Sequence, residues 1–276
     1  MHESWSYSKE LPLKVFRAVD LEFLAHWHTD AELVYVLSGS IGVSVNREKR
    51  VLGRGSFIAC GSRDIHYYER SGGRSEALLA VFKPSLVGRS PVWPAGGRLA
   101  GHFALASEGS SLAEASGRVL LGVERELAEK RPAYEGIARG GIMELCALAE
   151  RELSSLGGEN GCESARAGPE APTLERMQLA IDFIYERYAY PIRLADAAKA
   201  ASLSPWYFSR AFSATVGASF RSFLNGVRIE RAEELMSEPG AKLADIALEY
   251  GFESVRTFNR AFLALRGRPP KSIRRA

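Results

Sequence analysis

Two nine-residue stretches, SPWYFSRAF at residues 204–212 and SVRTFNRAF at residues 254–262, decide the fold of the C-terminal part of this chain. They lie fifty residues apart, and each follows a short alanine-rich segment and a tight turn. A helix, a turn and a second helix form a helix-turn-helix unit, whose second helix can enter the major groove of DNA. The repeat therefore predicts two reading helices for adjacent major grooves.

Each predicted reading helix has an apolar face and an outward face. Phe208 and Phe212 in the first copy, and Phe258 and Phe262 in the second, recur at helical spacing and are expected in the core. The outward side chains can read base edges through hydrogen bonds or methyl contacts. We predict DNA contacts from Trp206, Tyr207, Ser209, Arg210, Val255, Arg256, Thr257, Asn259 and Arg260.

An arginine occupies the same offset in both copies, at Arg210 and Arg260. The alternative interpretation, that these are solvated faces of helical hairpins, explains one exposed arginine but not its repetition. Trp206 has an alternative role, packing against the sugar-phosphate backbone of DNA. Residues 220 to about 237 predict one connecting helix of roughly 27 Å, close to the spacing of about 34 Å between successive major grooves.

The C-terminal region is similar to the DNA-binding domain of the AraC/XylS transcription regulators. The matching stretches are PIRLADAAKAASLSPWYFSRAFSATVGASFRSFLNGVRIERAEELM, residues 191–236, and LADIALEYGFESVRTFNRAFLALRGRPPKSIRR, residues 243–275. Ile273 stands where the family usually has an aromatic residue, away from the proposed reading faces. The resemblance implies a regulator that binds double-stranded promoter DNA and contacts RNA polymerase, more often as an activator than as a repressor.

The N-terminal part has a different pattern. Residues 11 to about 85 contain short β-branched or alternating runs separated by glycine-bearing turns, which predict a small β-barrel or jelly roll. Helical spacing at about 111–130 and 134–156 predicts a helical pair that can pack on the barrel or form a homodimer. Residues 157–172 have no periodicity and are expected to be a linker.

Histidines and a carboxylate mark a candidate site among these strands. His26, His28, Glu32 and Gly39 have the spacing His-x-His-x3-Glu-x6-Gly, and Gly55 and His66 follow, which resembles the two cupin motifs. The resemblance implies a cupin-like sensor domain with a small-molecule effector, and a sugar or sugar derivative is the expected ligand. The residues assigned to this effector site are His26, His28, Glu32, Tyr35 and His66.

The same side chains allow a second chemistry. His26, His28, Glu32 and His66 are a competent ligand set for zinc, manganese, iron or nickel. Sensor domains that resemble this one often keep these residues without a metal, for hydrogen bonds to a small ligand or to the barrel itself, so no metal and no other cofactor are predicted. A metal-dependent cupin enzyme with a helical appendage is the alternative function, and it leaves the fifty-residue repeat unexplained. A sugar-binding module with protein-binding helices is a third, and it predicts no salt-dependent DNA affinity.

Composition agrees with a globular protein that binds a polyanion. The chain has 276 residues, of which 46% are hydrophobic and 25% charged. Residues 173–276 hold 16 Lys+Arg and 11 Asp+Glu, a balance of +5, against −2 for the remainder. No apolar run reaches the roughly 20 residues that span a bilayer, and no signal peptide is recognised. Cys60, Cys146 and Cys162 lack metal spacing and indicate free thiols in the cytoplasm.

The sequence therefore predicts an α+β protein of two domains. Residues 1–156 form a cupin-like jelly roll with a helical pair, residues 157–172 form the linker, and residues 173–276 form an all-α domain with two helix-turn-helix units. The predicted protein is not an enzyme. It is a cytoplasmic, effector-controlled transcription regulator without membrane contact.

Overall fold

The computed structural model describes residue 7 and residues 10–94, 104–106, 108–157, 171–236 and 242–270. The chain divides into two compact units, residues 2–174 and residues 175–276. Most of the linker predicted at residues 157–172 lies outside the described residues. No helix in the described ranges combines the length and the apolar character that crossing a lipid bilayer requires.

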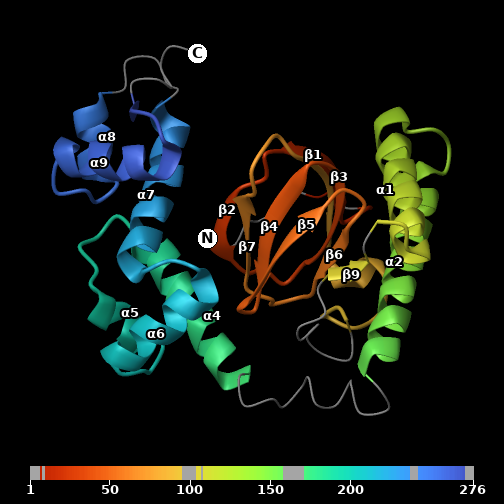
Figure 1. The fold of residues 1–276 in the computed structure, drawn as a ribbon, viewed down its shortest axis with the longest axis horizontal. Helices are drawn as coiled ribbons and strands as arrows, with labels where there is room; N and C mark the ends of the chain where they lie inside the picture. Colours follow the sequence, from red (N-terminus) through yellow and green to blue (C-terminus); the bar gives the residue numbers. More distant parts are fainter. Residues whose placement is uncertain are drawn as a thin grey trace. The chain divides into compact units, whose positions relative to one another are not determined.

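The N-terminal unit is built on two antiparallel sheets (Figure 1). One sheet has the strand order β1-β8-β3-β6-β9 and the other has the order β2-β7-β4-β5. This double-sheet architecture confirms the predicted jelly roll. The strands are β1 (Leu13–Val19), β2 (Phe23–His26), β3 (Ala31–Ser38), β4 (Ser40–Val45), β5 (Glu48–Gly53), β6 (Phe57–Cys60), β7 (His66–Arg70), β8 (Glu76–Phe82) and β9 (Ala104–Ala106).

Strand β3 shows how the two faces of the larger sheet divide the core. Side chains alternate along a strand, so Leu33 faces one side while Val34 and Val36 face the other. Val34 and Val36 belong to the cluster that fills the space between the sheets, together with Ile41 and Val43 of the smaller sheet. Leu33 belongs to the cluster that the larger sheet shares with two helices.

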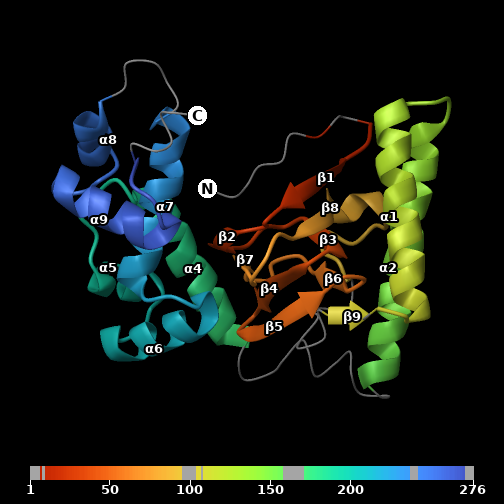
Figure 2. The same ribbon diagram turned by 45° about the horizontal axis from the view of Figure 1, so that its top comes forward.

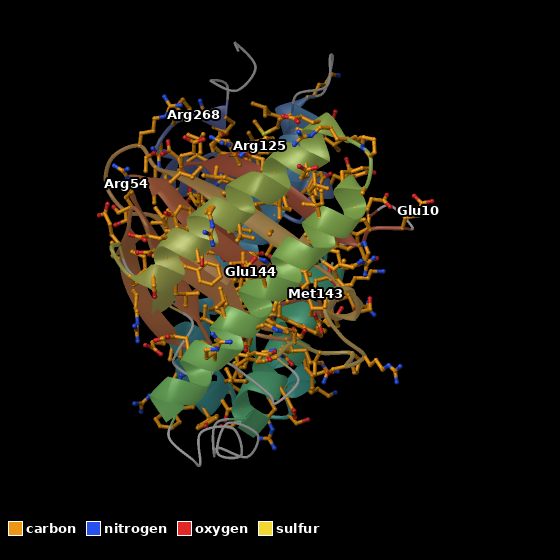
Figure 3. All side chains as sticks on the ribbon, turned by 90° about the vertical axis from the view of Figure 1, so that its right-hand side faces the viewer. Glu10, Arg54, Arg125, Met143, Glu144 and Arg268 are labelled. Atoms are coloured by element: carbon orange, nitrogen blue, oxygen red, sulfur yellow. The ribbon has the colours of Figure 1, made fainter. Side chains whose placement is uncertain are left out.

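These two helices are α1 (Ser111–Glu129) and α2 (Tyr134–Gly157), close to the predicted ranges. They contact each other and the strands of the larger sheet, and Figure 3 shows them side by side over that sheet. Met143 and Glu144, labelled in Figure 3, are exposed on α2, whereas Ile142 and Leu145, which flank them in sequence, are buried. The helical pair therefore closes the core of this unit with one face of each helix.

The C-terminal unit is helical throughout its described residues. Helix α7 runs from the pair α5–α6 to the pair α8–α9 (Figures 1 and 2), and it contacts α6, α8 and α9. Its 17 residues correspond to about 25 Å, as the predicted connecting helix requires. The helices are α4 (Ala171–Arg187), α5 (Leu194–Ala200), α6 (Pro205–Val216), α7 (Phe220–Met236), α8 (Leu243–Glu249) and α9 (Val255–Arg266).

Helices α6 and α9, which correspond to the two predicted reading helices, begin and end through the same local chemistry. The side chains of Ser204 and Ser254 accept hydrogen bonds from backbone N–H groups of the first turn. Gly217 and Gly267 end the helices with φ of 74° and 65°, a left-handed conformation that glycine adopts without steric cost. The repeat in sequence is thus a repeat in structure.

Candidate functional site

Four polar side chains from different segments meet between the two sheets. His26 ends β2 and lies opposite His66 of β7, and His28 follows in the turn after β2. Glu32 lies on β3 in the other sheet, where it pairs with Cys60 of β6. All four are buried, with exposed fractions from 0% for His66 to 8% for His26. The structure therefore brings together four of the five residues assigned to the effector site.

Each of the three imidazoles is held by its own backbone hydrogen bond. The Nδ1–H groups of His26, His28 and His66 donate to carbonyl oxygens of Leu24, Asp30 and Asp64, at 2.7, 2.9 and 2.9 Å. A carbonyl oxygen only accepts, so the proton of each neutral ring sits on Nδ1 and leaves Nε2 with a free lone pair. Three such rings, fixed in one orientation, present lone pairs to the same space.

The free nitrogens face a carboxylate. Nε2 of His28 lies 3.6 Å and Nε2 of His66 lies 3.8 Å from Oε2 of Glu32, too far for hydrogen bonds. Neither Nε2 atom has a hydrogen-bond partner among the described residues. Lone pairs that face an anion repel it, so a proton or a cation between these groups would stabilise the arrangement.

The ionisation of the cluster follows from this arrangement. Burial would raise the pKa of Glu32, but hydrogen bonds and charge from the rings of His28 and His66, when these carry a proton on Nε2, hold it well below its ordinary value. Burial, together with the charges of His66 and His28, lowers the pKa of His26 to about 3. Burial opposes protonation of His66, yet Glu32 raises its pKa overall. The cluster therefore contains one carboxylate that stays ionised and one ring, His26, that stays neutral.

Two residues not assigned to the site from the sequence complete it. The hydroxyl of Tyr68 donates to Oε1 of Glu32 at 2.5 Å, and Sγ of Cys60 lies 3.6 Å from the same hydroxyl. Tyr68 is two residues after His66 on β7, so both side chains point to the same face. Strand alternation after His66 is the sequence signal that identifies it. Its hydroxyl fixes the carboxylate with one oxygen turned towards the histidines.

The cluster has the donors that a transition-metal site needs. One ring nitrogen from each of His26, His28 and His66 lies within 4.8 Å of the others. Zinc bonds of about 2.0–2.1 Å in a tetrahedral set place neighbouring ligand atoms roughly 3.3 Å apart, close to the contacts with Glu32. Metal-binding histidines usually donate their other ring N–H to a carbonyl or carboxylate, as all three do here. The residues present therefore fit a divalent metal ion.

Tyr35 does not join this cluster. It lies three residues after Glu32 on β3, so alternation turns it to the opposite face of the sheet. There it packs with the residues shared by the larger sheet and α1. A Cβ atom added to Gly117 of α1 would lie 2.7 Å from the ring and the hydroxyl of Tyr35. The structure thus places Tyr35 under α1, away from the histidines.

In the C-terminal unit, Arg210 of α6 and Arg260 of α9 are exposed, while the phenylalanines two residues before and after each of them are fully buried. The first copy adds the exposed Trp206, Tyr207 and Ser209, and the second adds the exposed Arg256 and Asn259. Val255 and Thr257 are half-buried. Val255 packs against the core of α7, α8 and α9, and the Thr257 hydroxyl lies 3.0 Å from that of Ser254.

Trp206 and Arg210 form a contact that the second copy lacks. They lie one turn apart on α6, and the Arg210 guanidinium carbon is 5.0 Å from the centroid of the Trp206 ring. This is the geometry of a cation–π interaction. The exposed fraction of Trp206 is 69%, so the ring is available to solvent as well as to the arginine.

Comparison with known proteins identifies both units. Residues 18–82 match the family model described as a cupin domain, and residues 197–276 match the one described as a helix-turn-helix domain. The uncharacterized HTH-type transcriptional regulator YijO of Escherichia coli is 32% identical over 112 residues, 39% of this chain and 40% of that protein. The regulatory protein PocR of Salmonella typhimurium is 33% identical over 95 residues, 34% of this chain and 31% of that protein.

The chain thus spans about 40% or less of the length of these two relatives. Among solved structures, the crystal structure of ToxT from Vibrio cholerae is similar over 96% of this chain and 97% of that one, with 13% identity and a TM-score of 0.45. The C-terminal domain of AraT from Geobacillus stearothermophilus is 28% identical over 36% of this chain and 84% of that one, with a TM-score of 0.34.

Proposed function

We propose that this chain, which combines a cupin domain with a helix-turn-helix domain of the AraC type, is a transcription regulator that binds DNA through α6 and α9 under the control of its cupin domain. The observation that supports this most is the repeat itself. Two helices with the same caps and the same buried phenylalanines each expose an arginine at the same offset. The relatives named above carry regulator names, which agrees with this function.

The DNA-contact residues are the nine predicted from the sequence. Arg210 and Arg260 are assigned to guanine, because arginine can donate two hydrogen bonds to O6 and N7 in the major groove. Asn259 suits adenine in the same way. Tyr207, Ser209 and Arg256 extend the exposed faces, whereas Val255 and Thr257 contribute only the part of each side chain that solvent reaches.

The DNA assignment is tested by selecting bound fragments from random duplexes with the full chain. Arg210→Ala and Arg260→Ala are each expected to weaken binding to the selected site by about 1–3 kcal/mol and to relax specificity at one position. Glu175→Ala, an exposed change on α4, serves as the control. Unchanged affinity in both arginine variants would remove α6 and α9 from the interface.

The cupin cluster is the proposed effector site. Its effect on DNA binding would be a population shift, in which the effector binds one arrangement of the chain more tightly than another. His26, His28, Glu32 and His66 supply the polar groups, and a sugar or sugar derivative is one class of ligand that such groups bind. Tyr35 packs on the opposite face of β3, against α1, and is not retained in the proposed site.

A divalent transition metal is the second candidate occupant, and a specific observation favours it. The Nε2 atoms of His28 and His66 lie 3.6 and 3.8 Å from Oε2 of Glu32 without a hydrogen-bond partner among the described residues, and the cluster is almost fully enclosed. When bound, such a metal would act as an electrostatic centre that binds anionic or oxygen-bearing ligands. Turnover by a metal-dependent enzyme is the corresponding alternative function.

Metal analysis of protein purified without a histidine tag separates these candidates. One equivalent of metal in the wild type, lost in His66→Ala, supports the metal. A wild type free of metal after dialysis against zinc or nickel supports the organic effector. If the wild type holds metal but its DNA affinity stays the same after the metal is removed with a chelator, the metal does not control DNA binding.

We further propose that this protein contacts RNA polymerase, that it activates rather than represses transcription, and that it forms a homodimer through α1 and α2. The outer face of α2 exposes Ile137 and Met143, which suits a subunit contact. Sedimentation of the wild type and of Met143→Glu measures the oligomeric state directly.

A further inference from the structure

Arg228, in the middle of α7, carries a permanent charge and is nevertheless buried, with an exposed fraction of 8%. A buried guanidinium is costly unless its N–H groups are bonded. Burial lowers the pKa of Arg228, and the charge of the exposed Glu253 only partly opposes this. The burial of this charge therefore depends on the groups that bond to the guanidinium.

The guanidinium joins segments from both helix-turn-helix units. Its Nε donates to the carbonyl of Tyr188 at 2.7 Å, and its Nη2 donates to the carbonyl of Tyr190 at 2.9 Å. Both carbonyls belong to the segment that follows α4 and leads into the first helix-turn-helix unit, α5–α6. The guanidinium also lies 5.6 Å from the ring centroid of Phe252, in the turn between α8 and α9 of the second unit.

The same two segments touch each other directly. Gly251 has φ of 81°, and a Cβ atom added there would lie 2.7 Å from the carbonyl oxygen of Ala189 and 2.9 Å from that of Tyr188. The rings of Tyr188 and Tyr250 are stacked, with centroids 6.1 Å apart and planes 19° apart. The turn between α8 and α9 therefore lies against the segment that leads from α4 into α5, and Arg228 contacts both.

We propose that Arg228 is a positioning residue that fixes α9 relative to α6, and so sets the distance between the two DNA half-sites that the protein accepts. The inference rests on the proposed DNA-binding function. Without these contacts, the pairs α5–α6 and α8–α9 would be joined through α7 alone, as a single rod that can bend. Bonds from the middle of α7 to segments 188–190 and 250–252 remove that freedom.

A fixed pair of reading helices discriminates between spacings. One inserted base pair moves the second half-site by about 3.4 Å and turns it by about 35° around the duplex. A protein whose two helix-turn-helix pairs are held in a fixed arrangement cannot follow that change and loses contacts with one half-site. A protein whose helix-turn-helix pairs move relative to each other can follow it and tolerates both spacings.

The experiment uses the full chain and a site selected from random duplexes, rebuilt with one base pair added or removed between its halves. Affinities at one salt concentration are compared for the wild type, Arg228→Leu and Arg228→Lys. We expect the wild type to lose on the order of ten- to hundredfold on altered spacing, like one mismatched base pair, and Arg228→Leu to lose roughly threefold or less. Arg228→Lys should fall between them, because an ammonium cannot reproduce the planar fork.

Arg221→Leu, an exposed arginine on the same helix, is the matched control. It should leave the ratio between spacings at the wild-type value, whatever its effect on overall affinity. Circular dichroism and thermal unfolding verify that each variant is folded. If Arg228→Leu does not fold, Arg228→Lys carries the test, because it keeps the charge but loses the planar fork that bonds to the carbonyls of Tyr188 and Tyr190.

The outcomes are distinct. A wild-type spacing ratio in the folded Arg228 variants, or selection of a single half-site by the wild type, overturns the inference and leaves DNA binding intact. Failure of the wild type to select any duplex overturns the proposed function and this inference together.

Discussion

The two arginines of the repeat have different surroundings, although they share one offset. Arg210 lies over the ring of Trp206, whereas the residue at the corresponding position of the second copy is Arg256, which offers no ring. An arginine held on an aromatic face loses less side-chain freedom when it binds a base. The first helix-turn-helix unit thus has an arginine that is ordered before DNA is bound.

Replacement of Trp206 tests this preorganisation. Trp206→Ala should weaken binding to the selected site by about 0.5–1 kcal/mol through loss of the exposed cation–π contact, and Trp206→Phe should recover part of it. Titrations against the selected site and against single-base variants measure both affinity and specificity. Equal losses in the two variants would instead indicate direct contact between the indole and DNA.

Tyr68 provides a second test at the scale of one residue. Tyr68→Phe removes the hydroxyl that holds Glu32 and should weaken metal binding by about 10–100-fold, as is typical when a hydrogen bond to a ligand is lost. Tyr67→Phe, a change at the neighbouring residue on β7, is the matched control. Competition with a chelator gives both affinities, and equal values in the two variants would contradict the role assigned to Tyr68.

Among the elements, helix α1 packs closely on the larger sheet at Gly117, a residue that has no side chain. A Cβ atom at Gly117 would overlap Tyr35, whereas one at Gly122 of the same helix meets no atom within 4 Å. Gly117→Ala should therefore destabilise the protein by about 1–3 kcal/mol through overpacking.

Gly122→Ala is the control for the helix itself, because alanine is favoured over glycine in a helix by up to about 1 kcal/mol. Chemical denaturation gives both free energies of unfolding. Equal stabilisation by the two changes would show that Tyr35 moves aside and that the contact does not seat the helix.

A second contact between α1 and the sheet depends on pH. Arg17 of β1 donates from Nε and Nη2 to the two oxygens of Glu124, at 2.7 and 2.9 Å, and this lowers the pKa of Glu124. A carboxyl with a lowered pKa in the folded state stabilises that state above its unfolded pKa of about 4.3, and the contribution disappears as the pH falls through the folded pKa.

Glu124→Gln should accordingly cost at most about 1 kcal/mol at pH 7, because the pair is partly exposed and screened by solvent. At a pH below the lowered pKa of Glu124, the variant and the wild type should converge in stability, since the wild-type carboxyl is then protonated as well. Denaturation curves from pH 7 down to about pH 2 measure the difference, and a difference that stays constant over this range would contradict the electrostatic explanation.

At the scale of the molecule, each unit has its own core. The cluster of α7, α8 and α9 contains residues of the C-terminal unit alone, and the two clusters of the N-terminal unit contain residues of that unit alone. Such units are expected to fold separately.

A fragment of residues 171–276 should therefore fold cooperatively and bind the selected duplex. Its balance of basic residues makes the logarithm of the binding constant fall linearly with the logarithm of the salt concentration. The fragment of residues 1–156 should show no such affinity. A fragment that binds with no salt dependence would contradict an interface formed on DNA phosphates.

Much of the fold could be predicted because its determinants are local. The period of the apolar residues, the capping serines and the terminal glycines of α6 and α9 all lie within two short segments, 204–217 and 254–267, and each favours the observed conformation on its own. The spacing of His26, His28 and Glu32 was likewise sufficient to expect their convergence with His66. The position of Tyr35 was available from alternation along β3, since an odd offset from Glu32 turns it to the other face.

Sequence alone determined the repeat, the two-domain organisation and the four residues of the buried cluster. Only the tertiary structure decided which groups hold the side chains of Arg228 and Glu32 in place. The carbonyls that hold Arg228 are backbone atoms 38 and 40 residues away, and the hydroxyl that holds Glu32 comes from the other sheet, 36 residues on. Backbone carbonyls exist at every residue and carry no sequence signal, so packing of the folded chain selects which of them a buried charge meets.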